Sequence, residues 1–340
     1  MSLDWTHGKV EMAHGGGGRA MTQLIDALFL PAFDNAVLSA RNDQAVLPAP
    51  CQKLVVATDS HVISPLFFPG GDIGSLAVHG SLNDLALAGA RPRYLTAAFI
   101  LEEGFPLADL KRIAASMARA AQEAGVSIVT GDTKVVERGK ADGVFITTTC
   151  VGEMLDDQSR GVTQIRPGDQ ILLSGTLGDH GMAVMSLREG LQFDSDLMSD
   201  TQSLHGLIEA MIVAVPDIHC MRDPTRGGVA AVLNEIASQT QLGIRLEEKA
   251  IPVNPAVQGA CDLFGLDPLF VANEGKLLAF CPPEQTAYLL ATMRSHPQGE
   301  QAALIGEVSA DYPGQVSMRT TLGGLRRVDW LSGDPLPRIC

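Results

Sequence analysis

The sequence lacks the cysteine pairs and apolar segments that define several classes of protein. Its six cysteines include no C-x-x-C pair, so zinc-site and thioredoxin-like patterns find no support. No apolar run reaches the roughly 18 residues that suggest a membrane span. The N-terminus shows no basic region followed by an apolar one. We therefore expect a cytoplasmic protein with reduced thiols and no membrane partner.

Basic residues are also scarce, with 25 Lys and Arg against 39 Asp and Glu and a net charge of −14. Because phosphate backbones require a basic face, this composition argues against a nucleic-acid partner. An acidic protein can still bind a polyphosphate when a divalent cation bridges the like charges. The 340 residues, 46% of them hydrophobic, can bury a substantial core and suggest two domains.

The common nucleotide-binding motifs are absent. The chain contains neither a G-x-x-x-x-G-K-[ST] loop nor a G-x-S-x-G elbow. It does contain four successive glycines, which cannot lie inside a stable helix or strand. We expect a loop there, either mobile or close to a bound group, formed by Gly15, Gly16, Gly17 and Gly18. No βαβ pattern follows, so a dinucleotide fingerprint is not indicated.

Apolar runs alternate with helical periodicity from about residue 53, which predicts an α/β (α+β) fold. The predicted strands are 53–57, 94–101, 127–130, 144–151, 170–174, 276–280 and 303–308. The predicted helices are 74–89, about 110–121, 204–215 and 229–237. We expect a glycine-rich segment (1–40), two α/β domains (41–155 and 165–325) and a flexible tail (326–340). Prolines in this tail disfavour a regular helix.

Four carboxylates flank the predicted strands and helices of the first domain. Asp59 and Asp132 follow strands, Asp72 precedes a helix, and Asp84 lies in the segment SLNDL. Functional groups of α/β sheets gather at strand ends, and Mg²⁺ prefers carboxylate and phosphate oxygens. The four acids therefore suggest a metal–phosphate site, where Lys134 could contact a phosphate. Each acid alone could instead cap a turn or helix, and Asp72 fits that alternative well.

Seven segments carry a resemblance that spans residue 14 to the last residue. They are HGGGGR (14–19), TDSHVISPLFFPGGDIG (58–74), SLNDLALAGARP (81–92), TGDTKV (130–135), DPTRGGV (223–229), NEGK (273–276) and PRIC (337–340). Together they resemble the HypE family of hydrogenase maturation factors. SLNDLA and GDT alone would indicate only the superfamily of aminoimidazole ribonucleotide synthetase, selenophosphate synthetase and thiamine-monophosphate kinase. The terminal PRIC points to HypE.

The resemblance implies a fold and a set of ligands. It implies two domains of the aminoimidazole ribonucleotide synthetase-like type and a homodimer formed by the N-terminal domains. It also implies ATP and Mg²⁺ as cofactors. The nucleotide-binding residues would be Gly15, Gly16, Gly17, Gly18, Asn83, Asp84, Gly131, Asp132 and Lys134. The metal ligands would be Asp59, Asp72, Asp84 and Asp132.

The resemblance further implies a reaction on the chain's own last residue, Cys340. The carbamoyltransferase HypF would load Cys340 with a carbamoyl group, and ATP-dependent dehydration would convert the thiocarbamate into a thiocyanate. The HypC–HypD complex would then accept the cyano group for a [NiFe] hydrogenase centre. Lys134 would stabilise the transferring phosphoryl group, whereas Asn273 and Glu274 would contact the tail or relay its proton.

Two other classes of function remain open from the sequence. The chain could be another superfamily enzyme that acts on a free small molecule, in which case loss of Cys340 would leave turnover intact. It could also be a non-catalytic scaffold whose tail serves only for docking, in which case it would not hydrolyse ATP. The acids and Lys134 argue against the scaffold, and the terminal PRIC argues against the free substrate.

Overall fold

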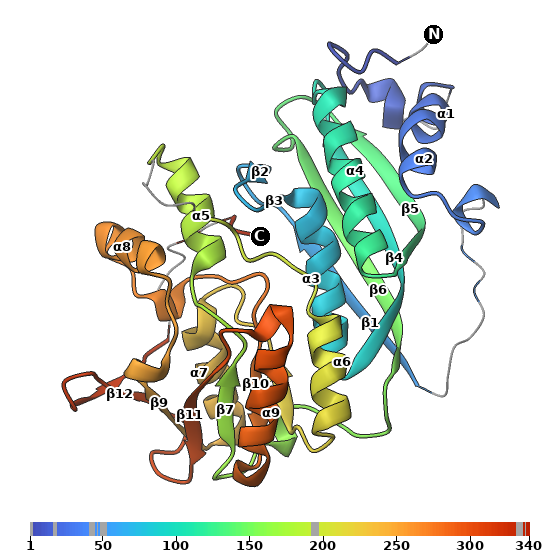
Figure 1. Ribbon diagram of the computed structural model, residues 1–340. Helices are drawn as coiled ribbons and strands as arrows, with labels where there is room; N and C mark the ends of the chain where they lie inside the picture. Colours follow the sequence, from blue (N-terminus) through green and yellow to red (C-terminus); the bar gives the residue numbers. More distant parts are fainter. Residues whose placement is uncertain are drawn as a thin grey trace.

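The chain folds into two α/β units that lie side by side, the first containing the N-terminus and the second most of the C-terminal half (Figure 1). The computed structural model describes residues 3–15, 19–40, 45, 47, 53–191, 197–330, 336 and 338–340. Several residues of the sequence analysis lie outside these ranges, namely Gly16, Gly17, Gly18, Pro335 and Pro337.

The first unit is a four-stranded sheet with helices on one face. Its strands are β1 (Leu54–His61), β4 (Ala90–Glu102), β5 (Ser127–Val136) and β6 (Val144–Met154). The strand order is β1-β6-β4-β5, so β1 and β5 form opposite edges of the sheet. The covering helices are α3 (Ile73–Leu87) and α4 (Leu107–Glu123) (Figure 1). Residues of β4 alternate between buried and more exposed positions, as expected when one face is covered.

Short elements extend this unit at its N-terminal side. They are a 3₁₀ turn (Met12–Gly15), α1 (Arg19–Leu24), a π-helical turn (Ile25–Phe29) and α2 (Leu30–Ala32), followed by a second 3₁₀ turn (Leu38–Ala40). The ring of Phe29 lies 4.9 Å from that of Phe99 on β4 and so anchors these turns to the sheet. The small hairpin β2 (Phe67–Phe68) and β3 (Gly71–Asp72) leads into α3.

The second unit is a seven-stranded sheet with helices on both faces. Its order is β13-β12-β9-β11-β7-β10-β8, and all pairs are antiparallel except β12 with β9. The strands are β7 (Gln170–Leu173), β8 (Cys220–Arg222), β9 (Gly243–Glu247), β10 (Leu278–Cys281), β11 (Ala303–Ser309), β12 (Val316–Arg319) and β13 (Leu325–Arg327). The helices are α5 (Asp179–Arg188), α6 (His205–Ala214), α7 (Gly228–Thr240), α8 (Pro255–Phe264) and α9 (Pro283–Ser295). Short 3₁₀ turns cover Val162–Gln164, Glu248–Ala250, Pro268–Phe270 and Pro297–Gly299.

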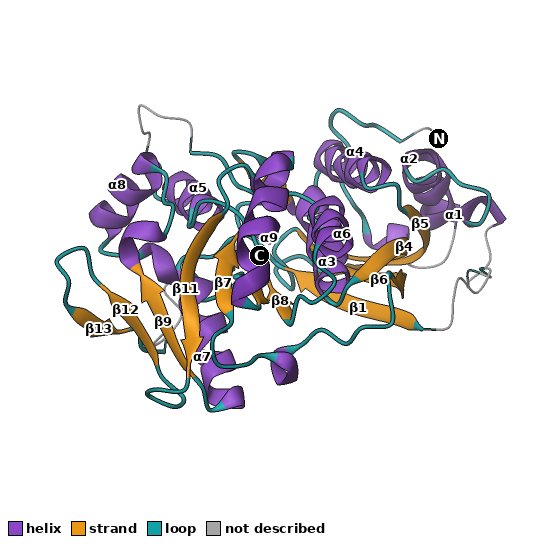
Figure 2. Ribbon diagram, turned by 60° about the horizontal axis from the view of Figure 1, so that its bottom comes forward, coloured by secondary structure: helices purple, strands orange, loops and turns teal. Residues whose placement is uncertain are grey.

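Helix α3 forms the junction between the two units. It is buried on nearly all sides, and it lies beside α6 of the second unit in both views (Figures 1 and 2). The amide of Asn83 fastens the two helices, because Nδ2 donates to Gln202 O (3.0 Å) and Oδ1 accepts from Leu204 N (2.7 Å). The junction therefore fixes how the strand ends of one unit face the loops of the other.

The predicted α/β class is confirmed, and each predicted strand and helix is present. Several strands are longer than predicted: β1 continues to His61 and β5 to Val136, β4 begins at Ala90, and β6 continues to Met154. Asp59 and Asp132 consequently lie inside edge strands rather than after them, which corrects the expectation from the sequence. Helices α5, α8 and α9 were not predicted. No helix in the described part of the chain has both the length and the apolar character required to cross a membrane.

Candidate active site

Acidic side chains from both units gather at the domain junction. Asp59 comes from β1, Asp84 from α3, Asp223 from the loop after β8, and Glu274 from the loop before β10. Their charges act on one another: those of Asp223 and Asp59 raise the pKa of Asp84, and all three raise that of Glu274. The structure thus brings together three residues that the sequence analysis named and one, Asp223, that it did not.

Burial, and then mutual repulsion, disfavours ionisation of these acids. Desolvation, followed by the charges of Asp223 and Asp59, raises the pKa of Asp84 to about 7, although part of this side chain stays exposed. Burial is also the main cause that raises the pKa of Asp223. A site in which neighbouring carboxylates disfavour ionisation is suited to a cation, which would relieve the repulsion.

Glu274 is the most deeply buried acid of this group. Only 5% of the residue is exposed, and its Oε1 has no hydrogen-bond partner. Burial, and then the charges of Asp200, Asp223, Asp59 and Asp84, raise the pKa of Glu274 well above its usual value. A buried carboxyl with an unpaired oxygen costs stability, so its presence indicates a function.

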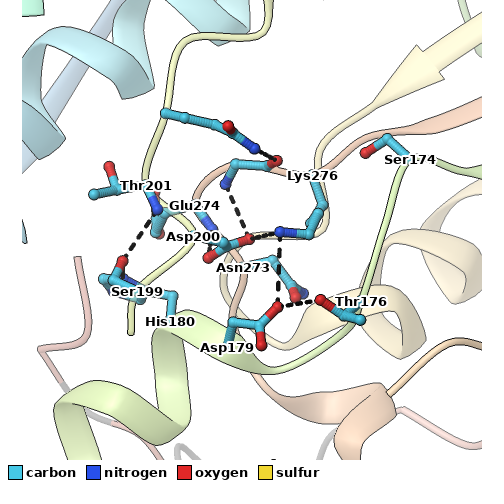
Figure 3. Close-up of polar contacts among 12 residues, drawn as sticks. Ser174, Thr176, Asp179, His180, Ser199, Asp200, Thr201, Asn273, Glu274 and Lys276 are labelled. Carbon is cyan, nitrogen blue, oxygen red and sulfur yellow. Dashed lines mark hydrogen bonds and ion pairs between the residues drawn. The ribbon is translucent and has the colours of Figure 1, made fainter. Parts of the chain in front are cut away.

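A network of buried charges holds the backbone that carries Glu274 (Figure 3). The carboxylate of Asp200 accepts from Glu274 N (3.1 Å), Gly275 N (3.2 Å) and Lys276 Nζ (3.0 Å). Lys276 Nζ also lies 3.7 Å from Asp179 Oδ2. Burial alone would raise the pKa of Asp200, but the charge of Lys276 and the hydrogen bond donated by Glu274 N help to outweigh it and lower the pKa. This network was missed from the sequence, because nothing near Asp200 marks it as a partner of the segment NEGK.

The side chain of Asn273 supports the same loop and does not face a cavity. Its Oδ1 accepts from Gly178 N (2.8 Å), and its Nδ2 donates to Pro224 O (2.9 Å) and Val271 O (3.0 Å). The side chain is fully buried, and backbone groups satisfy both ends of its amide. Asn273 therefore holds the loop that carries Glu274; the sequence predicted that it contacts the tail or relays its proton.

Asp59 lies next to a buried histidine. His61 Nε2 lies 3.4 Å from Asp59 Oδ2, and the His61 side chain is only 1% exposed. Gly80 of α3 leaves room for this pair, because a Cβ there would lie 2.9 Å from His61 Nε2 and 3.3 Å from Asp59 Oδ2. Asp59 thus faces α3, on the covered side of the sheet.

Asp72 and Asp84 occupy the same helix but have different surroundings. Asp72 is the N-cap of α3, and its Oδ1 accepts from Gly74 N (2.8 Å) and Ser75 N (3.1 Å). A capping box closes the helix end, because Ser75 Oγ also accepts from the backbone Asp72 N (3.1 Å). The capping alternative considered for Asp72 is therefore correct.

Asp132 and Lys134 lie apart from the acidic group. Lys134 Nζ is 3.1 Å from Asp132 Oδ1, and both side chains are exposed on β5, at the edge of the sheet opposite β1. Asp132 borders a cavity of about 520 Å³ between β5 and the N-terminal turns, lined also by Gly131 and Phe29. Gly131 is required where β5 meets β4, because a Cβ there would lie 2.2 Å from Ala97 O.

The C-terminal residues lie against the end of β1 instead of extending freely into solvent. Val62 N donates to Cys340 O (3.1 Å), and Cys340 is half-buried. Val62 follows Asp59 by three residues, so their backbones are at most about 11 Å apart. The described part of the tail is thus docked against the segment that follows β1.

The other described cysteines are buried and poorly suited to reaction. Burial raises the pKa values of the Cys150, Cys220 and Cys261 thiols to about 12 and that of Cys281 to about 11. Cys51 lies outside the described residues. Because the thiolate is the nucleophile, these thiols are largely unreactive at neutral pH.

Within the described ranges, no group of three His, Cys, Asp or Glu side chains is arranged to hold a metal ion.

Comparison with known proteins defines the class first. The model of the AIR synthase related protein N-terminal domain matches residues 41–154, and that of the C-terminal domain matches residues 166–318. These matches and the fold show that the chain belongs to the AIR synthase related family.

Full-length relatives then define the particular family. The chain is 63% identical over 338 residues to the carbamoyl dehydratase HypE of Azotobacter vinelandii, with 99% of each covered. A crystal structure of HypE in complex with ATP is 50% identical with a TM-score of 0.94, covering 97% of this chain and 99% of that one. A HypE–HypF complex matches at 48% identity and a TM-score of 0.80, covering 91% and 99%. The chain belongs to the HypE family.

Proposed function

We propose that the protein is an ATP-dependent carbamoyl dehydratase that acts on its own Cys340 and supplies the cyanide ligands of [NiFe] hydrogenases. The observation that carries the proposal is the full-length similarity to carbamoyl dehydratases HypE. The docking of Cys340 next to the strand that bears Asp59 supports the assignment of the thiol as carrier. The solved HypE structure with ATP supports ATP as the co-substrate.

The reaction removes the elements of water from a thiocarbamate. In –S–C(=O)–NH₂ the oxygen is a poor leaving group, and ATP supplies the phosphoryl group that makes it a good one. The oxygen leaves as part of inorganic phosphate, both N–H protons leave the nitrogen, and –S–C≡N and ADP remain. Cys340 holds the reacting group through its sulfur throughout, while Glu274 accepts a proton from the nitrogen.

Glu274 can serve as a base only when it is ionised. Burial, and then its acidic neighbours, raise the pKa of Glu274, so a cation close to Asp59, Asp84 and Asp223 would favour the carboxylate. The Asp200–Lys276 pair keeps the Glu274 backbone in place. The base would therefore become active only when the acidic group binds metal and nucleotide.

Magnesium is the cation that suits this site. Because no three acidic side chains of the described residues converge on one point, one or two of Asp59, Asp84 and Asp223 would hold each Mg²⁺ together with ATP phosphates and waters. The crowded carboxylates and the unpaired oxygen of Glu274 fit such an ion. Asp72 has one carboxylate oxygen left after capping. Bound Mg²⁺ would neutralise the phosphate charge that develops during the reaction.

A homodimer would complete the phosphate site. Asp132 and Lys134 pair with Ala98 and Ile100 of β4, so they share the open face of the sheet, opposite α3. Leu54, Val56 and Ile100 expose 59%, 57% and 42% of their surfaces on that face. A second copy packed there would cover these apolar residues and supply groups that one chain keeps far from its acids. In this proposal Lys134 stabilises the transferring phosphoryl group, and residues 15–18, Asn83 and Gly131 contribute to nucleotide binding.

The proposal includes two partners. HypF loads Cys340, as supported by the solved HypE–HypF complex, and the HypC–HypD complex accepts the cyano group. All of these steps would take place in the cytoplasm.

Intact mass measurement tests the proposal. Incubation with the carbamoyltransferase, carbamoyl phosphate and Mg–ATP should add one carbamoyl group to the chain and then remove one water. Cys340→Ala should show neither change while still binding Mg–ATP. If Cys340→Ala still converts a carbamoyl donor into a cyano product, the substrate is a free small molecule and the self-modifying mechanism is wrong.

A further inference from the structure

The last three residues of the chain lie in a site built from two separate segments, residues 62–64 after β1 and helix α5. On the β1 side, Val62 N donates to Cys340 O (3.1 Å) and Ser64 N donates to Arg338 O (3.2 Å). Arg338 Nε donates in return to Val62 O (3.0 Å). These contacts resemble the addition of a short strand to a free edge, which recognises main chain rather than side chains.

Helix α5 supplies two side chains on the other side of the tail. His180 Nε2 lies 2.7 Å from Ile339 O. The guanidinium of Arg188 donates to both Arg338 O and Ser64 O, so it ties the tail to the segment after β1. The site therefore contacts the main-chain oxygens of three consecutive residues, Arg338, Ile339 and Cys340.

The hydrogen bonds of His180 have a defined direction. A carbonyl oxygen only accepts, so Nε2 must carry the proton that is donated to Ile339 O. In the neutral ring Nδ1 then accepts from Ser199 Oγ (2.7 Å), which in turn accepts from Thr201 N (3.1 Å). Complete burial of the ring lowers the pKa of His180 and favours this neutral form. Figure 3 shows His180 beside Ser199 and Asp200, the residue that holds the Glu274 backbone.

Buried side chains and an unusual backbone angle add to the docking. Ile339 and Leu336 are only 2% and 6% exposed. Arg338 has a positive φ of 54°, a conformation that non-glycine residues keep only where surrounding contacts enforce it. Val62, Ser64, His180 and Arg188 all bond to main-chain oxygens of the tail. Docking through the main chain is therefore compatible with a free, carbamoylated or cyanated thiol.

We propose that His180 and Arg188, together with the backbone of residues 62–64, form a docking site for the C-terminal tripeptide and act as positioning residues for Cys340. The contribution of this site to dehydration rests on the proposed function. The docking itself does not, because it can be measured on the unmodified protein.

The rate at which iodoacetamide alkylates Cys340 measures docking directly, by mass spectrometry of the C-terminal peptide of the full-length protein. Arg188→Met should raise this rate about fivefold or more, as expected from the loss of hydrogen bonds worth a factor of about five each. Arg188→Lys should restore part of the protection. Arg245→Met, which removes a surface arginine paired with Glu307, is the matched control and should alkylate at the parent rate.

Two substitutions of His180 test whether a donor at the position of Nε2 protects Cys340 from alkylation. His180→Gln keeps a donor near the position of Nε2 and should stay close to the parent rate, whereas His180→Asn should alkylate several-fold faster. Melting temperature and Mg–ATP binding identify any variant that does not fold. Loaded Arg188→Met should dehydrate at least several-fold more slowly, with an unchanged KM for ATP.

Each result decides one part of the proposal. A folded Arg188→Met protein that alkylates at the parent rate would overturn the docking site. Faster alkylation with normal dehydration would overturn the positioning role. If Cys340 proved not to be the carbamoyl carrier, the alkylation rates would still report docking, so failure of the proposed function is distinguishable.

Discussion

Glu274 illustrates how a single residue can signal function through an unfavourable environment. The fold buries its carboxyl group among other acids and leaves Oε1 without a partner. Such an arrangement costs folding free energy. The Asp200–Lys276 pair nevertheless holds the Glu274 backbone in place. We infer that the carboxyl is retained for proton transfer.

Glu274→Gln should therefore separate activity from stability. The amide cannot accept the proton from nitrogen, so dehydration should fall on the order of 10²-fold or more. Intact mass should show the carbamoylated chain accumulating. The melting temperature should not fall, because the variant removes no favourable ion pair of Glu274. Glu307→Gln on β11 serves as the control and should dehydrate normally; equal turnover in the two variants would remove Glu274 from the mechanism.

Asp84 leads to a prediction about pH. Its pKa rises from 3.8 in the unfolded chain to about 7 in the folded one, so the folded state binds this proton more tightly. The resulting stability is present below the unfolded pKa and is lost as pH rises through about 7. In EDTA the melting temperature should therefore fall between pH 5.5 and 8, and Asp84→Asn should reduce that fall.

The stabilisation by Mg²⁺ should have the opposite dependence on pH in the parent protein. If Asp84 binds Mg²⁺, the stabilisation by Mg–ATP should be greater at pH 8 than at pH 5.5, and Asp84→Asn should lose both this effect and on the order of 10²-fold in turnover. Parallel melting curves for parent and variant across pH, with or without Mg²⁺, would contradict the assignment.

At the scale of elements, α3 connects stability to the site. Its N-cap carries Asp72, its middle carries Gly80 against the His61–Asp59 pair, and its last turns carry Asn83 and Asp84. A helix buried on nearly all sides tolerates few changes, because close packing transmits any added volume to its neighbours. The position of the acids therefore depends on the packing of this helix.

Two glycine-to-alanine substitutions test this dependence. In an exposed helix the change stabilises by about 0.5–1 kcal/mol, which we expect for Gly259→Ala in α8, where a Cβ meets nothing within 4 Å. Gly80→Ala should instead destabilise by about 1–3 kcal/mol, because its Cβ displaces His61. It should also weaken Mg–ATP binding. Chemical denaturation and calorimetric titration would measure both, and stabilisation by Gly80→Ala would contradict the packing argument.

At the scale of the whole molecule, the open face of the first sheet predicts self-association. The parent protein should scatter light as a particle of twice 35.9 kDa at micromolar concentration. Leu54→Lys should shift this mass toward that of one chain, because a charge in a buried interface is unfavourable. Leu322→Lys, at a position 97% exposed near the β12–β13 turn, is the control and should leave the mass unchanged. A parent protein that scatters as one chain would refute the homodimer.

Local sequence patterns were sufficient to predict much of the architecture. Apolar runs and helical periodicity predicted α3, α4 and the central strands, since one residue's burial correlates with that of its neighbours two to four positions away. They failed at β1 and β5, where exposed edges carry polar residues such as Asp59 and Asp132 that resemble loop residues. Helix α5 was missed because its apolar periodicity is weak; it follows Gly178 and carries Asp179 and His180 in its first turn.

By itself, the sequence determined the two α/β units, the acids of the first unit, the glutamate of the segment NEGK and the terminal thiol, because each depends on residues adjacent along the chain. Only the tertiary structure added Asp223 to those acids, joined Asp200 to Lys276, and brought His180 and Arg188 to the tail. These partners lie tens to hundreds of residues apart, and their contact depends on how α3 packs between the two sheets. Local propensity carries no information about that packing, so the acids could be named in advance but their common site could not.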